Sequence, residues 1–440
     1  MKKIKSKKGL ILYGCSGLGV NMLNMIVGSY LCSALLVGGF EKHIESWTYL
    51  NKDLVVSGLW AIFMFLAKAL DGIIDLPLST FADKLNTKFG RRKTAIWIGQ
   101  IPMILSYLLF LVPLNNGPTY LNTIWFGVLL CTFYSSYTLT MLTYYATFSE
   151  VCETEKDTVF LSNTKSICDV VYMSLSFALV PMFVGMGINI RLVALMFFPF
   201  VLTMLIPFFM LDESKEEGKS KKQEPPLTLK ESLKHSFQNK TYIFWLFTLS
   251  VATVGLQLFL GGINELFSTT GLDMTVVMAS AFAPVPLTLM LYNKIIKRFG
   301  FAHAYRYALG IFAVGMLIMF ICCQSTNLSK TALTLIAVGG GILVSFAIGA
   351  FFSITYTVPS HLARKEMEEK GVSVSSMYFA VQGLFEGIAA GIGTGFILVT
   401  LKDFDMISLL PIIVIVCGII AIVMTFFFEK DFAKMGKEKK

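Results

Sequence analysis

Three charged residues stand inside a long apolar stretch, in the segment KALDGIIDLP at positions 68 to 77. Lys68, Asp71 and Asp75 are spaced by three and four residues, so in a helix their side chains lie on one face. A charge at the centre of a bilayer costs about 2.5–3.5 kcal/mol, which favours a functional reason for keeping it there. Two neighbouring carboxylates suit a hard monovalent cation, which prefers oxygen ligands, or a proton shared between like charges. A structural Lys–Asp ion pair is the alternative, and it would leave one aspartate unpaired.

The second half of the chain contains an uncharged counterpart of this stretch. The turn ADKLNTKFGRR, which begins at Ala82, is echoed by YNKIIKRFGFA, which begins at Tyr292. Four positions match: Lys84 with Lys294, Lys88 with Arg298, Phe89 with Phe299 and Gly90 with Gly300. At the same offset, Lys68, Asp71 and Asp75 correspond to Met278, Ala281 and Val285. The architecture therefore does not require the three charges, which favours the cation or proton role.

The elements that carry these residues are predicted to be membrane-spanning helices. The chain of 440 residues is 55% hydrophobic, and its 15% of charged residues is well below the roughly 25% typical of soluble domains. Apolar runs of about 20 residues, enough to cross the hydrocarbon core, recur along its length, and their continuity favours helices over barrel strands. We expect twelve spans, at residues 10–37, 54–81, 94–114, 121–148, 165–186, 190–211, 242–267, 272–296, 303–323, 331–357, 374–400 and 404–428.

Lysine and arginine residues are distributed unevenly between the expected loops. With the N-terminus in the cytoplasm, 31 of the 37 would lie in inner segments and five, Lys402 among them, in outer loops. This asymmetry predicts a multi-pass protein of the plasma (inner) membrane with both termini cytoplasmic. The basic tails then need no partner beyond the lipid bilayer, and we expect no nucleic acid.

The longest polar segment, residues 212–240, separates six expected spans from six others. Thr228 and Glu231 form a capping-box pattern ahead of apolar residues at helical spacing, which predicts a short amphipathic helix. The expected domains are an N-terminal six-helix bundle at 1–211, a cytoplasmic linker with this helix at 212–241, and a C-terminal six-helix bundle with a basic tail at 242–440. Repeated halves of this kind are typical of transporters that bind their substrate between the halves, near the midplane.

This organisation resembles the major facilitator superfamily. The basic FGRRK turn is similar to the short cytoplasmic loop that follows the second helix in that superfamily. The resemblance implies a major facilitator fold, all-α and integral to the membrane. It also implies a conformational gate at this turn, formed by Asp83, Gly90, Arg91 and Arg92.

KALDGIIDLP, followed by a polar turn ending in FGRRK, resembles the second helix of the glycoside–pentoside–hexuronide cation symporters, the melibiose permease-like family. The resemblance implies a cation site at Asp71 and Asp75, with Lys68 as the nearby basic residue. Lys68 is expected either to bind the substrate or to pair with the aspartates. SYTLTMLTYYATFSEV, from Ser136, resembles the family's fourth helix. In that helix, Thr138 falls where a threonine helps to bind the cation, and Tyr145 falls where an aromatic ring stacks on the sugar. Lys165 falls where a basic residue binds sugar hydroxyls, and Gln382 stands where melibiose permease has a lysine. We expect Tyr137, Tyr145, Lys165 and Gln382 to contact the substrate.

The sequence also departs from the melibiose permease pattern. Met141 stands where that family member has an aspartate, and Leu18 and Gly19 stand where it has a lysine and an aspartate. Ile74 replaces a polar neighbour of the cation pair. The acidic sugar clamp is thus largely missing, so the resemblance carries cation coupling over more fully than galactoside recognition.

Two further acids, Glu265 and Glu386, stand inside expected spans, and each suits a substrate contact or an interhelical hydrogen bond. Glu386 lies one turn beyond Gln382, so the two share a face. Asp169 follows Lys165 by four residues, a spacing that favours a structural pair. Tyrosines offer both a flat apolar face and a hydroxyl, which suits a sugar ring or a lipid headgroup as well as simple packing. Four cluster in the fourth span: Tyr134, Tyr137, Tyr144 and Tyr145.

The sequence therefore predicts a secondary active transporter that couples Na⁺ or H⁺ to the symport of a sugar or glycoside by alternating access. A carrier of lysolipid or another amphiphile with the same fold is the alternative. No nucleophile–base or metal constellation stands within the spans, so we expect no enzyme. We expect no cofactor beyond the coupling ion, which Asp71 and Asp75 would hold if it is sodium, and we expect a monomer.

Overall fold

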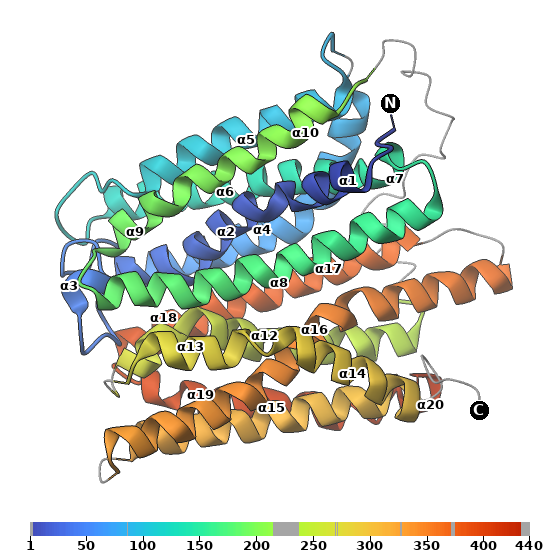
Figure 1. Cartoon of the computed structure of the whole chain (residues 1–440). Coiled ribbons are helices and arrows are strands. Elements are labelled where there is room, and N and C mark those ends of the chain that lie inside the picture. The colour runs from blue at the N-terminus through green and yellow to red at the C-terminus, as the bar shows by residue number, and fades with distance from the viewer. Residues whose placement is uncertain are drawn as a thin grey trace.

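Twelve helical stretches in the described part of the chain are long and apolar enough to cross a membrane. The computed structural model (Figure 1) describes residues 3–85, 87–213, 237–268, 270, 272–325, 328–370 and 375–432. The bounds of the twelve stretches differ from the expected spans by at most six residues, so the prediction of twelve helical spans is confirmed. The expected amphipathic helix falls largely on residues 214–236, which lie outside the described residues.

The first six spans run from residue 7 to residue 210. Their α-helices, together with the short helices between them, are α1 (Lys7–Gly14), α2 (Leu18–Ile26), α3 (Ile44–Trp47), α4 (Ser57–Lys84), α5 (Arg91–Phe110), α6 (Tyr120–Ala146), α7 (Phe148–Val151), α8 (Glu155–Gly185), α9 (Ile190–Phe197) and α10 (Leu205–Met210). The first span is not one regular helix, because a 3₁₀ segment at Cys15–Gly17 and a π-helical turn at Val27–Leu31 interrupt it. A further 3₁₀ segment at Ser33–Leu35 ends it, and another at Phe198–Met204 joins α9 to α10.

The last six spans run from residue 240 to residue 425. Their helices are α12 (Lys240–Ser268), α13 (Met274–Phe282), α14 (Val285–Phe299), α15 (Phe301–Gln324), α16 (Lys330–Lys370), α17 (Ser375–Gly391), α18 (Leu398–Asp403), α19 (Leu410–Thr425) and α20 (Glu429–Phe432). A π-helical segment at Ile392–Ile397 continues α17 into α18, and a 3₁₀ segment at Ile407–Leu409 precedes α19. The π-helical segment Ile392–Ile397 packs against α4 and α12, and the π-helical turn Val27–Leu31 packs against α12. Such turns often mark functional positions.

Side-chain caps mark where several of these helices begin. Thr119 accepts a hydrogen bond from the Asn122 N–H at the start of α6, and Asp273 accepts from the first turn of α13. Thr154 and Asp157 form a complete capping box ahead of α8. Each cap satisfies backbone donors that the helix itself leaves unpaired, so these polar residues set the helix boundaries.

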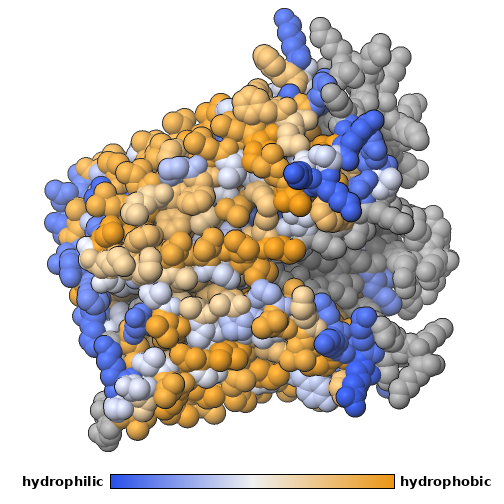
Figure 2. Space-filling view, viewed as in Figure 1, coloured by the Kyte–Doolittle hydropathy of each residue, from blue (hydrophilic) through white to orange (hydrophobic). Residues whose placement is uncertain are grey.

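The helices form two bundles that lie side by side in Figure 1, with α1 to α10 above and α12 to α20 below. The first helix, α1, and the last helix, α20, lie at one end of the molecule, the termini end, and α3 lies at the other, the α3 end. Figure 2 shows a mostly hydrophobic side surface, with hydrophilic residues gathered towards the two ends. That distribution is what a protein surrounded by a bilayer requires.

The two bundles also share a local feature of the sequence repeat. The matched glycines, Gly90 and Gly300, have the same backbone conformation, with φ of 97° and 86°.

The two bundles meet along α4 and α17, where glycines allow the backbones to approach closely. A Cβ atom on Gly72 would lie 2.4 Å from the Gly383 carbonyl oxygen. A Cβ atom on Gly387 would lie 2.6 Å from the carbonyl oxygen of Lys68. The helix that carries the three charges is therefore in direct backbone contact with the opposite bundle.

Replacing Gly72 by alanine should destabilise the protein by about 1–3 kcal/mol, because the added methyl group overpacks a backbone contact between the bundles. Gly58, in the same helix, is the matched control, since a Cβ atom there meets nothing within 4 Å. Thermal unfolding of the two purified alanine variants measures the difference. Equal melting temperatures for the two variants would contradict the close α4–α17 packing.

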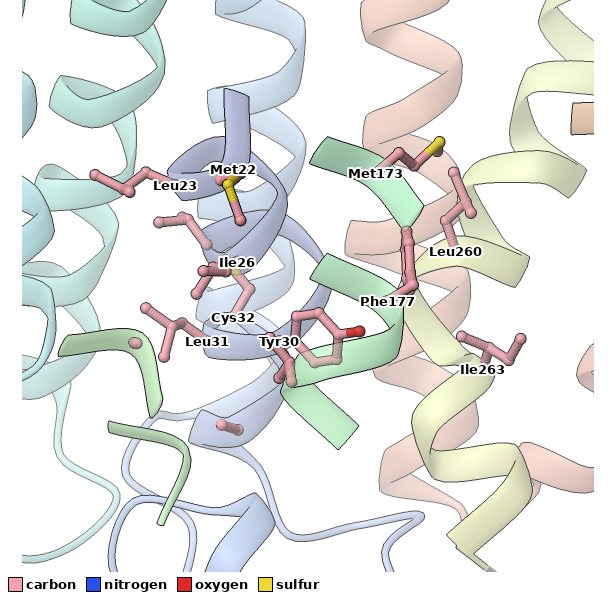
Figure 3. Close-up of a cluster of buried hydrophobic side chains, with 14 of the residues drawn as sticks. Met22, Leu23, Ile26, Tyr30, Leu31, Cys32, Met173, Phe177, Leu260 and Ile263 are labelled. Atoms are coloured by element: carbon pink, nitrogen blue, oxygen red, sulfur yellow. The ribbon is translucent and has the colours of Figure 1, made fainter. Parts of the chain in front are cut away.

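The bundles are also joined at the α3 end. The Asn264 side chain donates to the Ser29 carbonyl (3.2 Å), the Ser268 hydroxyl donates to the Gly39 carbonyl (3.2 Å), and the Glu41 N–H donates to the Ser268 hydroxyl (3.1 Å). Figure 3 shows the apolar cluster between the first span, α8 and α12 that fills this region. Its labelled members are Met22, Leu23, Ile26, Tyr30, Leu31, Cys32, Met173, Phe177, Leu260 and Ile263. The α3 end is thus closed by both polar and apolar contacts between the bundles.

Candidate functional site

The two aspartates of α4 have different surroundings. Asp71 accepts a hydrogen bond from the Thr138 hydroxyl of α6. Asp75 forms no hydrogen bond or ion pair with any residue that the structure describes. Its Oδ2 atom faces α17, 3.6 Å from where a Cβ atom on Gly383 would lie. The pair therefore offers carboxylate and hydroxyl oxygens at the contact between the two bundles, which are the ligands that a small hard cation prefers.

Lys68 does not neutralise the aspartates by a direct contact. Its ammonium lies 4.1 Å from the centroid of the Tyr134 ring, a cation–π arrangement, and forms no ion pair with a described carboxylate. A Cβ atom on Gly28, in the π-helical turn of the first span, would lie 3.9 Å from the Lys68 Nζ atom. The alternative of a closed Lys–Asp pair is therefore not what the structure contains, although Lys68 and Asp71 remain close enough to interact electrostatically.

A chain of polar contacts links three helices of the first bundle. The Tyr137 hydroxyl donates to the Asn21 side-chain oxygen (2.9 Å), and the Asn21 amide donates to Asp169 Oδ1 (3.3 Å). Asp169 forms an ion pair with Lys165 (2.6 Å), whose ammonium lies 4.6 Å from the centroid of the Tyr145 ring. The expected Lys165–Asp169 pair is thus present. The structure brings together Tyr137, Tyr145 and Lys165, and it adds Asn21, one of two asparagines in the apolar first span, which the spacing patterns do not single out.

The second bundle contributes a smaller polar group on α17. Gln382 donates to the Glu386 carboxylate (3.2 Å) and accepts a hydrogen bond from the indole N–H of Trp245 (3.0 Å). Gln382 is buried, whereas Glu386 is partly exposed. The expected shared face of these two residues is present, and Trp245 of α12 fixes the amide orientation from the other side.

Glu265 lies at the closed α3 end, away from these groups. Its carboxylate forms an ion pair with Lys402 (2.8 Å), and the side chains of Glu265 and Lys402 are 0% and 2% exposed. The same ammonium donates to the carbonyl and hydroxyl oxygens of Ser33 in the first bundle, both at 2.9 Å. The assignment of Lys402 to an outer loop is therefore wrong, because the eleventh span continues through α18 to Asp403 and buries this lysine. In this conformation, Glu265 is a partner in a contact between the bundles.

The FGRRK turn is held by a residue from the end of the sixth span. The Glu213 carboxylate accepts hydrogen bonds from the backbone N–H groups of Arg92 (3.1 Å) and Lys93 (3.2 Å), the first turn of α5. It packs against Gly90, where a Cβ atom would lie 2.0 Å from Glu213 Oε2. A carboxylate at this position caps the helix and complements its dipole. Arg91 and Arg92 take part in further interactions, and the side chain of Asp83, the remaining expected gate residue, lies outside the described residues.

The comparisons with known proteins agree with this architecture. Residues 12–428 match the family described as MFS/sugar transport protein. No curated protein sequence matches the chain.

Solved transporter structures share the fold at low sequence identity. The nucleoside transporter NupG is 14% identical, with 98% of this chain and 100% of that chain covered and a TM-score of 0.64. A bacterial homolog of the human lysosomal transporter Spinster, in an inward-facing and unoccupied conformation, is 13% identical, with 99% of each chain covered and a TM-score of 0.64. A structure described under substrate recognition in proton-dependent oligopeptide transporters is 12% identical, with 97% and 98% covered and a TM-score of 0.62.

At these identities, the solved structures support the fold alone, whereas the family match covers nearly the whole chain. The chain is therefore a membrane transporter, not an enzyme, and it belongs to the MFS/sugar transport protein family.

Proposed function

We propose that this transporter couples the movement of Na⁺ or H⁺ to the symport of a sugar or glycoside by alternating access. The observation that carries the proposal is the aspartate pair of α4. Asp71 is bound by Thr138, and Asp75 has no partner among the described residues although it lies at the contact between the bundles. An ionised carboxylate in a membrane span without a protein partner is costly unless a cation or a proton neutralises it.

The cation site consists of Asp71, Asp75 and Thr138. Lys68 supplies one positive charge near Asp71, so the empty site keeps one net negative charge that a single monovalent cation or proton cancels. Asp75 packs on α17, so the charge of the site acts on the surface where the bundles must move past each other. Loading or emptying this site therefore changes the relative stability of the two bundle arrangements, which is what coupling requires.

The substrate site lies between the polar groups of the two bundles. Tyr137, Tyr145 and Lys165 come from the first bundle, together with Asn21 and its partner Asp169. Tyrosine rings and fixed hydrogen-bonding groups suit the apolar faces and hydroxyls of a sugar ring. The second bundle contributes Gln382 and Glu386 on α17, and α17 packs against α4, the helix that carries Lys68.

Alternating access also requires contacts at the two ends of the transporter to form and break. The Gly90–Arg92 turn, with Asp83, acts as the conformational gate at the termini end, and Glu213 holds it in the present state. Glu265 reaches a substrate only in a state in which Lys402 has released it. The uneven distribution of basic residues supports placing both termini in the cytoplasm. In this proposal the protein works as a monomer in the plasma (inner) membrane, with domains at 1–211 and 242–440 joined by the linker at 212–241.

A panel of sugars, glycosides and lysolipids, each with and without Na⁺ and at two proton concentrations, tests this function. We expect one sugar or glycoside to raise the melting temperature of the purified protein and to accumulate in proteoliposomes only with an imposed cation gradient. Substrate and cation should strengthen each other's binding by the same factor, because linkage is reciprocal. In the Asn21→Ala variant, the substrate concentration for half-maximal uptake should rise. If only a lysolipid stabilised the protein and was transported, the substrate would be an amphiphile and not a sugar. Uptake that does not depend on any cation gradient would overturn symport.

A further inference from the structure

A hydrophobic groove lies on the first bundle between α5 and α10, away from the candidate transport site. Its volume is about 520 Å³, and its lining includes Phe89, Lys93, Trp97, Ile98, Ile101 and Phe208. The α5 residues among them recur at helical spacing, so they form one face of that helix. From Lys93 to Ile101, this face extends for about 12 Å along the helix axis. Figure 1 shows α5 and α10 together along the upper edge of the molecule, on the side remote from the second bundle.

Both spans that border the groove contain a proline. Pro102 stands inside α5, and the sixth span reaches α10 through the 3₁₀ segment Phe198–Met204 and continues past Pro207. Proline removes a backbone hydrogen bond from a helix. Ile98 and Ile101 are 41% and 49% exposed. In a membrane, such a surface faces the hydrocarbon chains of lipids.

One end of the groove is positively charged. Lys93 is in the first turn of α5, at the termini end, and its ammonium lies 5.1 Å from the centroid of the Phe208 ring. This ammonium forms no ion pair within the part of the chain that the structure describes. Trp97 follows one turn further into the span and packs edge-on against Phe208. A lysine followed by a tryptophan at the end of a span is typical of the headgroup level of a bilayer.

We propose that this groove binds one molecule of an anionic phospholipid. An acyl chain occupies the apolar wall between Trp97 and Ile101, and the headgroup phosphate pairs with the Lys93 ammonium. The match of charge selects the lipid: a basic side chain at the headgroup level favours anionic over zwitterionic lipids. The site does not depend on the identity of the transported substrate, since none of its residues belongs to the cation or substrate site.

Native mass spectrometry of the purified full-length protein tests this proposal, with phosphatidylglycerol and phosphatidylcholine of identical acyl chains as the probes. Wild-type protein should retain about five times more phosphatidylglycerol than phosphatidylcholine, which corresponds to about 1 kcal/mol for one basic side chain near the headgroups. Lys93→Gln should reduce the retained phosphatidylglycerol to the phosphatidylcholine level. Lys42→Gln, at an exposed lysine of the α3 end, should leave it unchanged.

A second variant tests the groove itself without changing its charge. Ile98→Trp adds bulk to a partly exposed wall residue, so it should reduce retention of both lipids while the protein remains folded. Equal retention of the two lipids by the wild-type protein would overturn the proposal. Undiminished retention of phosphatidylglycerol by both Lys93→Gln and Ile98→Trp would also do so, because the lipid would then be bound elsewhere.

Discussion

Replacing Asp75 by asparagine should abolish uphill accumulation of substrate in cells or proteoliposomes. Asparagine keeps the shape of the side chain but removes the charge that a cation or proton must neutralise. Losing one charge-assisted contact of about 1.5–3 kcal/mol should weaken activation by the coupling ion roughly 10- to 100-fold. Transport driven by the ion gradient is the measurement, together with exchange of labelled for unlabelled substrate at equal ion concentrations.

The matched control for this change is Asp405→Asn. Asp405 is exposed at the α3 end and has a left-handed conformation (φ 52°), which asparagine also tolerates. This variant should accumulate substrate like the wild type. Accumulation by the Asp75→Asn variant at the control level would refute a role for Asp75 in coupling. Asp71→Asn should also lose coupling, and its asparagine can still pair with the Thr138 hydroxyl, so the loss would reflect the missing charge.

The second large effect is expected at Lys402. Replacing this lysine by methionine leaves the Glu265 carboxylate buried without a partner and should destabilise the protein by about 3–5 kcal/mol. It also removes two hydrogen bonds to Ser33 and so weakens the contact that joins the bundles at the α3 end. The melting temperature of the purified variant should fall clearly below that of the wild type.

A double variant separates the ion pair from simple packing. When Glu265→Leu is added to Lys402→Met, no uncompensated charge remains, so much of the lost stability should return. Lys42→Met, at an exposed lysine of the same end, should melt like the wild type. A Lys402→Met protein that melts like the wild type, or a double variant less stable than the single one, would show that the pair is not the stabilising element.

Much of the candidate site could be predicted because the charges in KALDGIIDLP conflict with their apolar surroundings. Their one-face spacing and the i,i+4 spacing of Lys165 and Asp169 are local properties of a helix, and both are readable without knowledge of the fold. The residues that these side chains contact in other helices cannot be read from local spacing. The family resemblance assigns Thr138 to the cation site, and nothing in the spacing of α4 and α6 indicates that its side chain touches Asp71.

Lys402 shows where local reasoning fails. The residues around Lys402, LKDFD, have the composition of a polar loop. Assigning Lys402 to an outer loop is also compatible with the uneven distribution of basic residues between the two sides of the membrane. The structure buries it because Glu265 and Ser33, 137 and 369 residues away, supply a carboxylate and two oxygens at that point. The roles of Asn21 and Glu213 are not readable from the sequence for the same reason, since each side chain bonds to a segment more than 100 residues away.

The amino-acid sequence by itself determined that twelve helices are long and apolar enough to cross a membrane and that one of them carries three charges on one face. Hydropathy and helical spacing are properties of neighbouring residues, and the high cost of exposing backbone polar groups to lipid leaves few alternatives to helices. Only the tertiary structure decided which polar groups meet: the α4 aspartates with Thr138 and the glycines of α17, and Lys402 with both bundles. Such pairings depend on how the helices are rotated and how deep each residue lies, and these follow from close packing over the whole molecule.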